Sequence, residues 1–211
     1  MNKRFWAIIV VVILIFVGVV MMKNNKTNAP DSSNQPTSHI EGSTSSGVSL
    51  VEYGDYECPY CGNYFSTVKQ VAAQYNDKIT FQFRNLPLSQ VHPNAFAAAR
   101  AAEAAALQGK FWQMHDLLYE TQSAWVNSSA PKTMFDTYAK QLGLNVSQFD
   151  KDFASSKVND AINADVNAFA QTGDVTETPT FYLDGKKIQP APDVADFSKL
   201  IDAAIASKAQ K

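Results

Sequence analysis

Two cysteines separated by two residues, Cys58 and Cys61, are the residues whose type and spacing point most directly to chemistry. They are the only cysteines among the 211 residues, and Pro59 and Tyr60 lie between them. The thiolate of one cysteine can attack a disulfide, and the second thiol can then resolve the mixed disulfide that forms. The Cys-x-x-Cys spacing therefore predicts a dithiol/disulfide exchange site.

Half of a zinc site and a bare structural disulfide are the alternative roles of such a cysteine pair. A zinc site needs two further ligands, and the three histidines of the chain, His39, His92 and His115, do not occur at paired spacing. We therefore expect neither a metal nor a cofactor. The three histidines are interpreted as inert or structural, with His92 capping or packing against the helix that follows it.

The elements around the cysteines place them between a strand and a helix. Residues 48–53 form an apolar run typical of a buried central strand, and apolar residues recur at helical spacing over 61–75. Cys58 then lies at the helix start, where free N–H groups favour a negative charge, and Pro59 suits the first helical position. The sequence predicts Cys58 as the attacking thiolate and Cys61 as the resolving thiol on the buried face.

Three acidic residues lie close to the cysteines in the sequence. Glu52 interrupts the apolar strand, and burial of a carboxyl group raises its pKa toward neutrality. Such a group can pass a proton to or from a thiol, so Glu52 is predicted as a proton shuttle. The alternative is a residue at a strand end that contacts water. Asp55 and Glu57 are expected to oppose the thiolate by their charge.

The remaining elements give an α/β order with a helical block in its middle. Residues 79–83 alternate as a second strand, which makes a βαβ unit with parallel strands. Helices are predicted over 94–108, 111–119, 131–142, 147–153 and 158–171. A hairpin of strands 180–183 and 186–188 precedes a terminal helix over 194–206. The fold class is therefore predicted as α/β and thioredoxin-like, with a helical insertion at about 87–173 between the βαβ and ββα halves.

The composition of the first 23 residues predicts a membrane segment. Residues 5–22 carry no charge and are long enough to cross the bilayer as a helix. Lys3 and Arg4 in front of them place the N-terminus in the cytoplasm. Residues 1–23 are therefore predicted as a membrane anchor with a cytoplasmic tip, and a cleaved signal peptide is the alternative. Either segment would export the domain that follows.

A polar segment joins this anchor to the predicted domain. Residues 24–47 are rich in Ser, Thr, Asn, Gly and Pro, with Ile40 as the only large apolar residue, which predicts a flexible tether. Residues 48–211 are predicted as the folded domain. Beyond residue 23 the chain has 15 basic and 20 acidic residues, which argues against a nucleic-acid surface.

Four short motifs occur in a fixed order along the chain. They are Val51 to Cys61, His92 to Ala95, Gln108 to Trp112 and Thr178 to Phe181. In this order they resemble the DsbA-like thiol:disulfide oxidoreductases of bacteria, and the resemblance covers roughly residues 48–207. It implies a thioredoxin fold with a helical insertion, attack by Cys58 and resolution by Cys61, and Glu52 matches the buried acid of the family.

The resemblance also implies a substrate-binding surface. Thr178-Pro179 would be a cis peptide packed against the sulfurs, where its backbone receives the substrate chain. Pro59 and Tyr60 are also predicted to bind substrate. Tyr60 departs from the family pattern, because the most oxidising members have a histidine at this position that stabilises the thiolate. Tyrosine cannot do so by charge, so the direction of exchange is less well defined than its chemistry.

These features predict an exported, membrane-tethered thiol:disulfide oxidoreductase with its catalytic domain outside the cytoplasm, in the periplasm or cell-wall space. It is expected to act as an oxidant on reduced or misoxidised secreted proteins. Further expected partners are a membrane redox protein that resets Cys58–Cys61 and the membrane itself, through residues 5–22. A reductase or isomerase of the same fold is one alternative, although isomerases usually dimerise through an extra N-terminal domain and a monomer is expected here. A peptide-binding chaperone is the alternative from another class.

Overall fold

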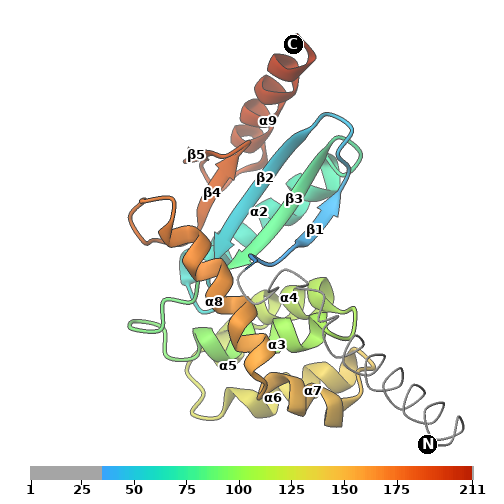
Figure 1. The fold of residues 1–211 in the computed structure, drawn as a ribbon, viewed down its shortest axis with the longest axis vertical. Helices are drawn as coiled ribbons and strands as arrows, with labels where there is room; N and C mark the ends of the chain where they lie inside the picture. Colours follow the sequence, from blue (N-terminus) through green and yellow to red (C-terminus); the bar gives the residue numbers. More distant parts are fainter. Residues whose placement is uncertain (1–34, 211) are drawn as a thin grey trace, which may run out of the picture. The chain divides into compact units, whose positions relative to one another are not determined.

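A five-stranded mixed sheet forms the centre of the fold in the computed structural model, which describes residues 35–210 (Figure 1). The strands are β1 (His39–Gly42), β2 (Val48–Gly54), β3 (Ile79–Asn85), β4 (Thr180–Leu183) and β5 (Lys186–Ile188). Their order in the sheet is β1-β3-β2-β4-β5. The middle strand β2 runs parallel to β3 and antiparallel to β4, so the predicted βαβ unit and the central position of β2 are confirmed.

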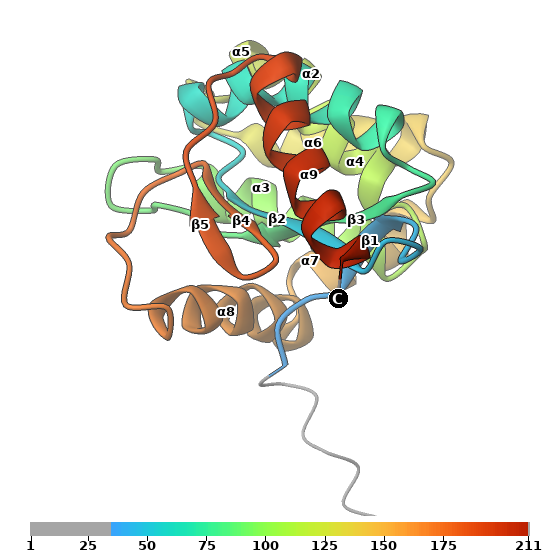
Figure 2. The same ribbon diagram turned by 90° about the horizontal axis from the view of Figure 1, so that it is seen from above.

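Helices lie on both faces of this sheet (Figure 2). α2 (Pro59–Gln74) and α9 (Val194–Ala209) cover one face, and α8 (Ser156–Ala170) crosses the other. The rest of the insertion consists of α3 (Ala95–Ala106), α4 (Phe111–Glu120), α5 (Gln122–Trp125), α6 (Pro131–Gln141) and α7 (Val146–Phe153). The predicted fold class, thioredoxin-like with a helical insertion, is confirmed. The sequence analysis missed the short helix α5.

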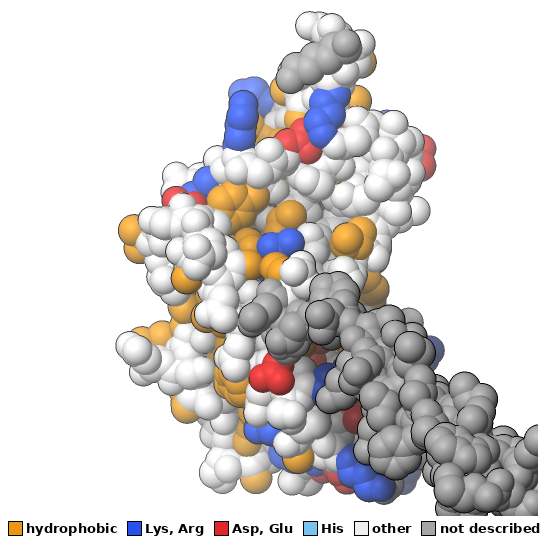
Figure 3. All heavy atoms as spheres, viewed as in Figure 1, with side chains coloured by type: hydrophobic (Ala, Val, Ile, Leu, Met, Phe, Trp, Pro, Cys, Tyr) orange, Lys and Arg blue, Asp and Glu red, His pale blue; other side chains and the backbone are white. Residues whose placement is uncertain are grey.

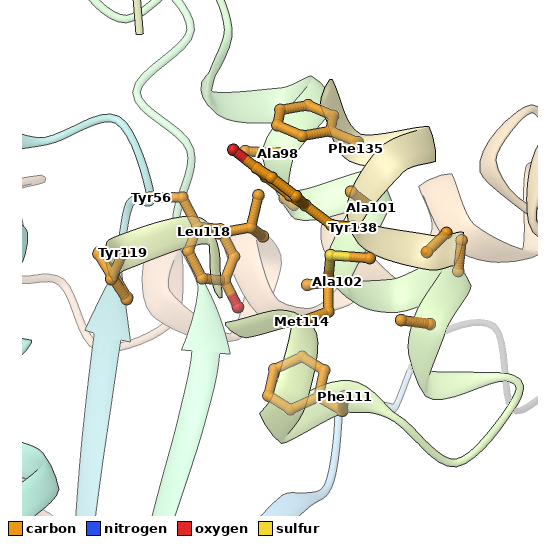
Figure 4. Packing of buried hydrophobic residues seen from close by; sticks show 14 of the residues in the cluster. Tyr56, Ala98, Ala101, Ala102, Phe111, Met114, Leu118, Tyr119, Phe135 and Tyr138 are labelled. Carbon is orange, nitrogen blue, oxygen red and sulfur yellow. The ribbon is translucent and has the colours of Figure 1, made fainter. Parts of the chain in front are cut away.

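The helices of the insertion pack around a hydrophobic core that they share with Tyr56 and with Phe83 of β3 (Figure 4). The alanines of α3 that face this core, such as Ala98, Ala101 and Ala102, are fully buried and let the neighbouring helices approach closely. Large side chains such as Phe135 and Leu118 fill the remaining space, and each stabilises the fold by about 1.5–3 kcal/mol through burial. Both cysteines also belong to this core, which places the redox site where the insertion meets the sheet.

The sheet face that carries α8 is only partly covered. A groove of about 630 Å³ runs beside α8 and is lined by Val51, Tyr53, Arg84 and Tyr182, among others. On the side of the molecule seen in Figure 3, acidic and basic side chains are interspersed with apolar ones.

The edge strand β1 is held on the domain by both polar and aromatic contacts. His39–Gly42 pairs antiparallel with β3. The ring of His39 stacks on Phe111 with a centroid distance of 3.4 Å, and its Nε2 lies 2.7 Å from Oε1 of the buried Glu103. Just before the strand, the N–H and hydroxyl of Thr37 donate to the buried carboxylate of Asp165, each at 2.7 Å.

These contacts correct the predicted domain boundary. The assignment of residues 24–47 to a flexible tether is wrong for residues 39–42, which form β1, and the domain begins before Val48. The interpretation of His39 as inert is wrong as well. The physical reason is that the partners of this polar segment, two buried acids and an aromatic ring, come from the insertion and cannot be inferred from the composition of the segment.

The predicted membrane anchor, residues 1–23, lies outside the described residues, as does the first part of the predicted tether. Within residues 35–210, every helix is too short or too polar to cross a bilayer. The anchor therefore stays a prediction.

Replacing His39 by Ala is expected to lower the free energy of unfolding by about 2 kcal/mol. The reason is that a hydrogen bond to a carboxyl group is lost and Glu103 stays buried with one partner fewer. Ile40→Ala is the matched control, since Ile40 follows on the same strand but is half exposed. Urea denaturation measures both variants, and equal losses would show that the contact to Glu103 does not fix β1.

Candidate active site

The two cysteines lie at the N-terminal end of α2. Cys58 immediately precedes the helix, and Pro59 occupies its first turn. Both cysteines are free thiols and are buried, with 4% of Cys58 and 0% of Cys61 exposed. The Cys58 thiol lies 3.4 Å from the carbonyl oxygen of Thr178, and the backbone N–H of Asp55 donates to Cys61 Sγ over 3.4 Å. The cysteines thus lie where the sequence placed them, while their roles as nucleophile and resolving thiol stay predictions.

The surroundings of the two thiols give them opposite acidities. The pKa of Cys58 falls to about 6, chiefly because the Cys61 thiol hydrogen-bonds its sulfur, with further lowering by Thr178 and the first N–H groups of the helix. Burial opposes this shift but does not cancel it. The pKa of Cys61 lies well above the usual range because the thiol is buried and hydrogen-bonds Cys58. Near neutral pH, Cys58 is therefore the thiolate, and Cys61 needs a base before it can attack.

The thiolate absorbance of Cys58 is expected to appear with a midpoint near pH 6. The rate at which Cys58 reacts with a small alkylating agent should follow the same curve. Because the folded pKa is lowered, the reduced protein gains stability over its unfolded chain as pH rises above about 6, and it loses this gain as pH falls through that value. A midpoint near that of an ordinary cysteine would contradict the proposed stabilisation of the thiolate.

Glu52 lies in the middle of the central strand β2 and is 3% exposed. Burial raises the pKa of its carboxyl group to about 8, so the group can both accept and release a proton near neutral pH. Glu52 lines a cavity of about 200 Å³, and His115, Asp116 and Lys69 also belong to its lining. Lys69 and Asp116 are partly exposed and form an ion pair of 2.8 Å. The cavity has room for several water molecules and polar groups to bind them.

Tyr119 brings a hydroxyl group into the same space. It lines the cavity, and its hydroxyl is buried with no partner among the described residues. A Cβ atom at Gly54 would lie 3.0 Å from this hydroxyl. Because residues 52 and 54 of a strand project from the same face, the Tyr119 hydroxyl occupies the side-chain position next to Glu52.

The residues predicted to contact substrate meet on the other side of Cys58. The Thr178-Pro179 peptide is cis, as the family resemblance implied. Thr178, Pro179 and Tyr60 line an open groove of about 710 Å³, together with Tyr64 and others. Tyr60 is 68% exposed, and Pro59 lies beside it at the helix start. This geometry suits an extended chain bound next to Cys58, and substrate contact by these residues stays a prediction.

Asp55 and Glu57 point into the loop after β3 and hydrogen-bond it. The Asp55 carboxylate accepts hydrogen bonds from the N–H groups of Glu57 and Leu88, each at 2.8 Å, and lies 2.7 Å from Nδ1 of His92. Glu57 Oε2 accepts a hydrogen bond of 2.6 Å from the N–H of Asn94. The expectation that these acids oppose the thiolate by their charge did not include these hydrogen bonds. The interpretation of His92 as capping or packing against the following helix did not include its contact with Asp55.

Gln122 is a further residue of the site that sequence reasoning missed. Its side-chain N–H groups donate to the carbonyl oxygens of Tyr56 and Cys58 at 2.8 and 2.9 Å, which ties α5 to the redox loop. A glutamine in a short helix carries no sequence signal for such a role. His92 had one weak signal, its place in the His-Pro-Asn-Ala motif.

A sequence profile of a thioredoxin family matches residues 34–203. This chain belongs to the thioredoxin family. The match begins before β1, in agreement with the corrected start of the folded domain.

Solved structures of similar proteins support this assignment. A thioredoxin-like oxidoreductase from Silicibacter pomeroyi DSS-3 is 27% identical, with a TM-score of 0.65 over 83% of this chain and 98% of that one. BdbD from Bacillus subtilis is 22% identical, with a TM-score of 0.70 over 82% and 97% of the two chains. α-DsbA1 from Wolbachia pipientis is 17% identical, with a TM-score of 0.72 over 82% and 93%. These structures show that the folded domain shares the thioredoxin-like fold of known oxidoreductases.

Curated relatives match the folded domain over part of their length. The Na(+)/H(+) antiporter NhaA 1 of Mycolicibacterium gilvum is 36% identical over 167 residues, which are 78% of this chain and 26% of the relative. NhaA 3 of Salinispora tropica is 37% identical over 169 residues, or 80% and 25%. The chain spans about a quarter of the length of these relatives, so ion transport is not carried over to it.

Proposed function

We propose that the DsbA-like domain introduces disulfides into exported proteins, with Cys58 as the exchanging sulfur and Cys61 as the resolving one. The observation that carries this proposal is the opposite acidity of the two thiols, with the pKa of Cys58 lowered to about 6 and that of Cys61 raised. A stabilised thiolate stabilises the reduced protein. The disulfide form therefore gives up its bond more readily and is the better oxidant.

In the oxidising direction, a substrate thiolate attacks Cys58 Sγ of the Cys58–Cys61 disulfide. Cys61 leaves as a thiolate and takes a proton from Glu52, because the pKa of a buried Cys61 is high. The second substrate thiolate then attacks the substrate sulfur of the mixed disulfide and displaces Cys58 as its stable thiolate. The two electrons that the substrate loses reduce the cysteine pair. Its two thiol protons pass to solvent, and solvent returns one proton to Glu52.

The groove beside Cys58 holds the substrate during this exchange. It is lined by Tyr60, Thr178 and Pro179, and its open form suits unfolded chains of varied sequence. A redox partner in the membrane resets the cysteine pair by the reverse steps. Residues 5–22 anchor the protein, with its redox domain outside the cytoplasm; this part rests on the composition of the N-terminal segment alone.

The redox equilibrium of Cys58–Cys61 in glutathione buffers tests the direction of exchange. A pKa of about 6 lies between the values of about 7 for thioredoxin and about 3.5 for DsbA. We therefore expect a potential between about −270 mV and about −120 mV, the values of those two proteins. Oxidative refolding of a reduced test protein should proceed with the oxidised domain. A potential at or below that of thioredoxin would instead support a reductase.

Replacing Glu52 by Gln is expected to slow the step in which Cys61 gains or loses a proton by about 10²-fold. Attack by Cys58 on a small disulfide should keep its rate, because Glu52 is not among the groups that set the acidity of Cys58. Stopped-flow kinetics with a peptide disulfide separates the two steps. Glu41→Gln, at the same cavity, is the matched control. Equal rates of Cys61 resolution in both variants would exclude the shuttle.

The same variant has a defined effect on stability. The folded pKa of Glu52, about 8, lies above its usual value of 4.5. The wild-type protein therefore loses stability as pH rises from about 4.5 to about 8, because over this range the unfolded chain releases the Glu52 proton while the buried group keeps it. Glu52→Gln removes this loss and should be the more stable protein at pH 8.

A further inference from the structure

The carboxylate of Asp55 is fully buried beside the redox pair. Its own backbone contacts both cysteines, because its carbonyl oxygen accepts the N–H of Cys58 at 3.1 Å and its N–H donates to Cys61 Sγ at 3.4 Å. A negative charge held here disfavours a second negative charge on the sulfurs. How well the Asp55 charge is neutralised therefore affects how stable the Cys58 thiolate is.

Three donors surround this carboxylate. Two are the backbone N–H groups of Glu57 and Leu88, which are present whatever the side chains are. The third is Nδ1 of His92, at 2.7 Å from Oδ2. His92 is therefore the one donor to Asp55 in the described structure that depends on a side chain. The hydrogen bond from His92 to Asp55 reduces the negative field that the carboxylate exerts on the two sulfurs, whether or not the ring carries a second proton.

The loop that carries His92 is held in place independently of the imidazole. The backbone N–H groups of Val91 and His92 both donate to the carbonyl oxygen of Leu88 at 2.9 Å. At the end of the loop, Asn94 is bonded through its N–H to Glu57 and through its side chain to the carbonyl oxygens of Val126 and Ser128. The His92 side chain can therefore be changed without removing the main supports of the loop.

We propose that His92 is a positioning residue of the redox site, which neutralises the buried Asp55 carboxylate and so stabilises the Cys58 thiolate. His92 acts from the loop after β3. Tyr60, the residue inside the cysteine motif, cannot stabilise the thiolate by charge. Tyr60 is directed outward and is 68% exposed, while His92 reaches inward to the buried acid. The inference rests on the proposed role of Cys58 as the exchanging sulfur.

Substitutions at His92 test the proposal by their effect on Cys58. His92→Leu removes the donor and should raise the pKa of Cys58 by about half a unit. The equilibrium constant for oxidation of glutathione by the Cys58–Cys61 disulfide should then fall by about threefold. His92→Asn places an amide N–H near the position of Nδ1 and should recover most of the loss. Gln90→Ala, an exposed change in the same loop, is the control and should leave both quantities unchanged.

A double-mutant cycle with Asp55→Asn separates this role from a purely structural one. Without the Asp55 charge, His92→Leu should no longer shift the pKa of Cys58 or the redox equilibrium. A shift of the same size in both backgrounds, or no shift in the wild-type background, overturns the proposal. If circular dichroism shows that the Leu variant is unfolded, His92→Ala takes its place in the same cycle. The wild-type potential tests the proposed direction of exchange separately, since the shift is measured relative to it.

Discussion

Replacing Cys58 by Ser is expected to slow the oxidation of a reduced test protein by about a thousandfold or more, because the buried Cys61 alone cannot form the disulfide that the substrate thiolate attacks. The fold should survive, since a serine hydroxyl can keep the contact with the carbonyl oxygen of Thr178. The rate of oxidative refolding, followed by the return of enzyme activity in the test protein, measures the effect.

Cys61→Ser is the matched variant and should give a different product. For this variant the substrate is a protein that already contains a disulfide. A serine hydroxyl at position 61 can still donate to Cys58. The Cys58 thiolate then attacks the substrate disulfide and releases one substrate sulfur as a thiolate, and the mixed disulfide, which no thiol at position 61 can resolve, accumulates as a covalent complex on a non-reducing gel. The same two variants address the chaperone alternative. Full oxidative refolding by the Cys58→Ser protein would contradict the exchange mechanism, whereas suppression of aggregation by this variant alone would not.

Replacing Gly54 by Ala is expected to destabilise the domain by about 3 kcal/mol, which is the upper part of the range for overpacking a core. The added Cβ would lie 2.4 Å from Cε2 and 2.8 Å from Cζ of Phe83. Phe83 is fully buried in the same sheet and packs against Tyr56 and His115, so its ring has no free space into which it can move. Guanidinium denaturation measures the loss.

Phe83→Leu in combination with Gly54→Ala provides the control for this prediction. Phe83→Leu alone removes buried atoms and should cost stability by itself. In the double variant the smaller side chain makes room for the new methyl group. The double variant should therefore lose less stability than the sum of the losses of the two single variants. Simple additivity would mean that Phe83 is not what excludes a side chain at Gly54.

Local patterns were enough to predict the elements next to the redox site. The hairpin of β4 and β5 has the predicted limits because Asp184 and Gly185 both adopt positive φ, as a two-residue hairpin turn requires. The strand β2 and the start of α2 follow from an apolar run and from a proline at the first helical turn. These signals act over a few residues, and sequence periodicity reports such short-range preferences well.

Contacts between distant segments could not be predicted in this way. The strand β1 is polar in sequence and becomes a strand because His39 and Thr37 find the buried acids Glu103 and Asp165. The contact of His92 with Asp55 spans 37 residues. No periodicity encodes such a partner, because it depends on where the insertion and its loops meet the sheet.

The sequence by itself determined the kind of chemistry. Two thiols at the start of a helix, with an acid in the preceding strand, predict a disulfide exchanger in which Cys58 attacks and Cys61 resolves. Only the tertiary structure decided how that chemistry is tuned. The pKa of Cys58 depends on hydrogen bonds with Cys61 and Thr178. The pKa of Glu52 depends on burial, and the Asp55 carboxylate is hydrogen-bonded by His92. Each of these effects requires atoms brought within a few ångströms, and it is the packing of the insertion and the sheet that brings them together.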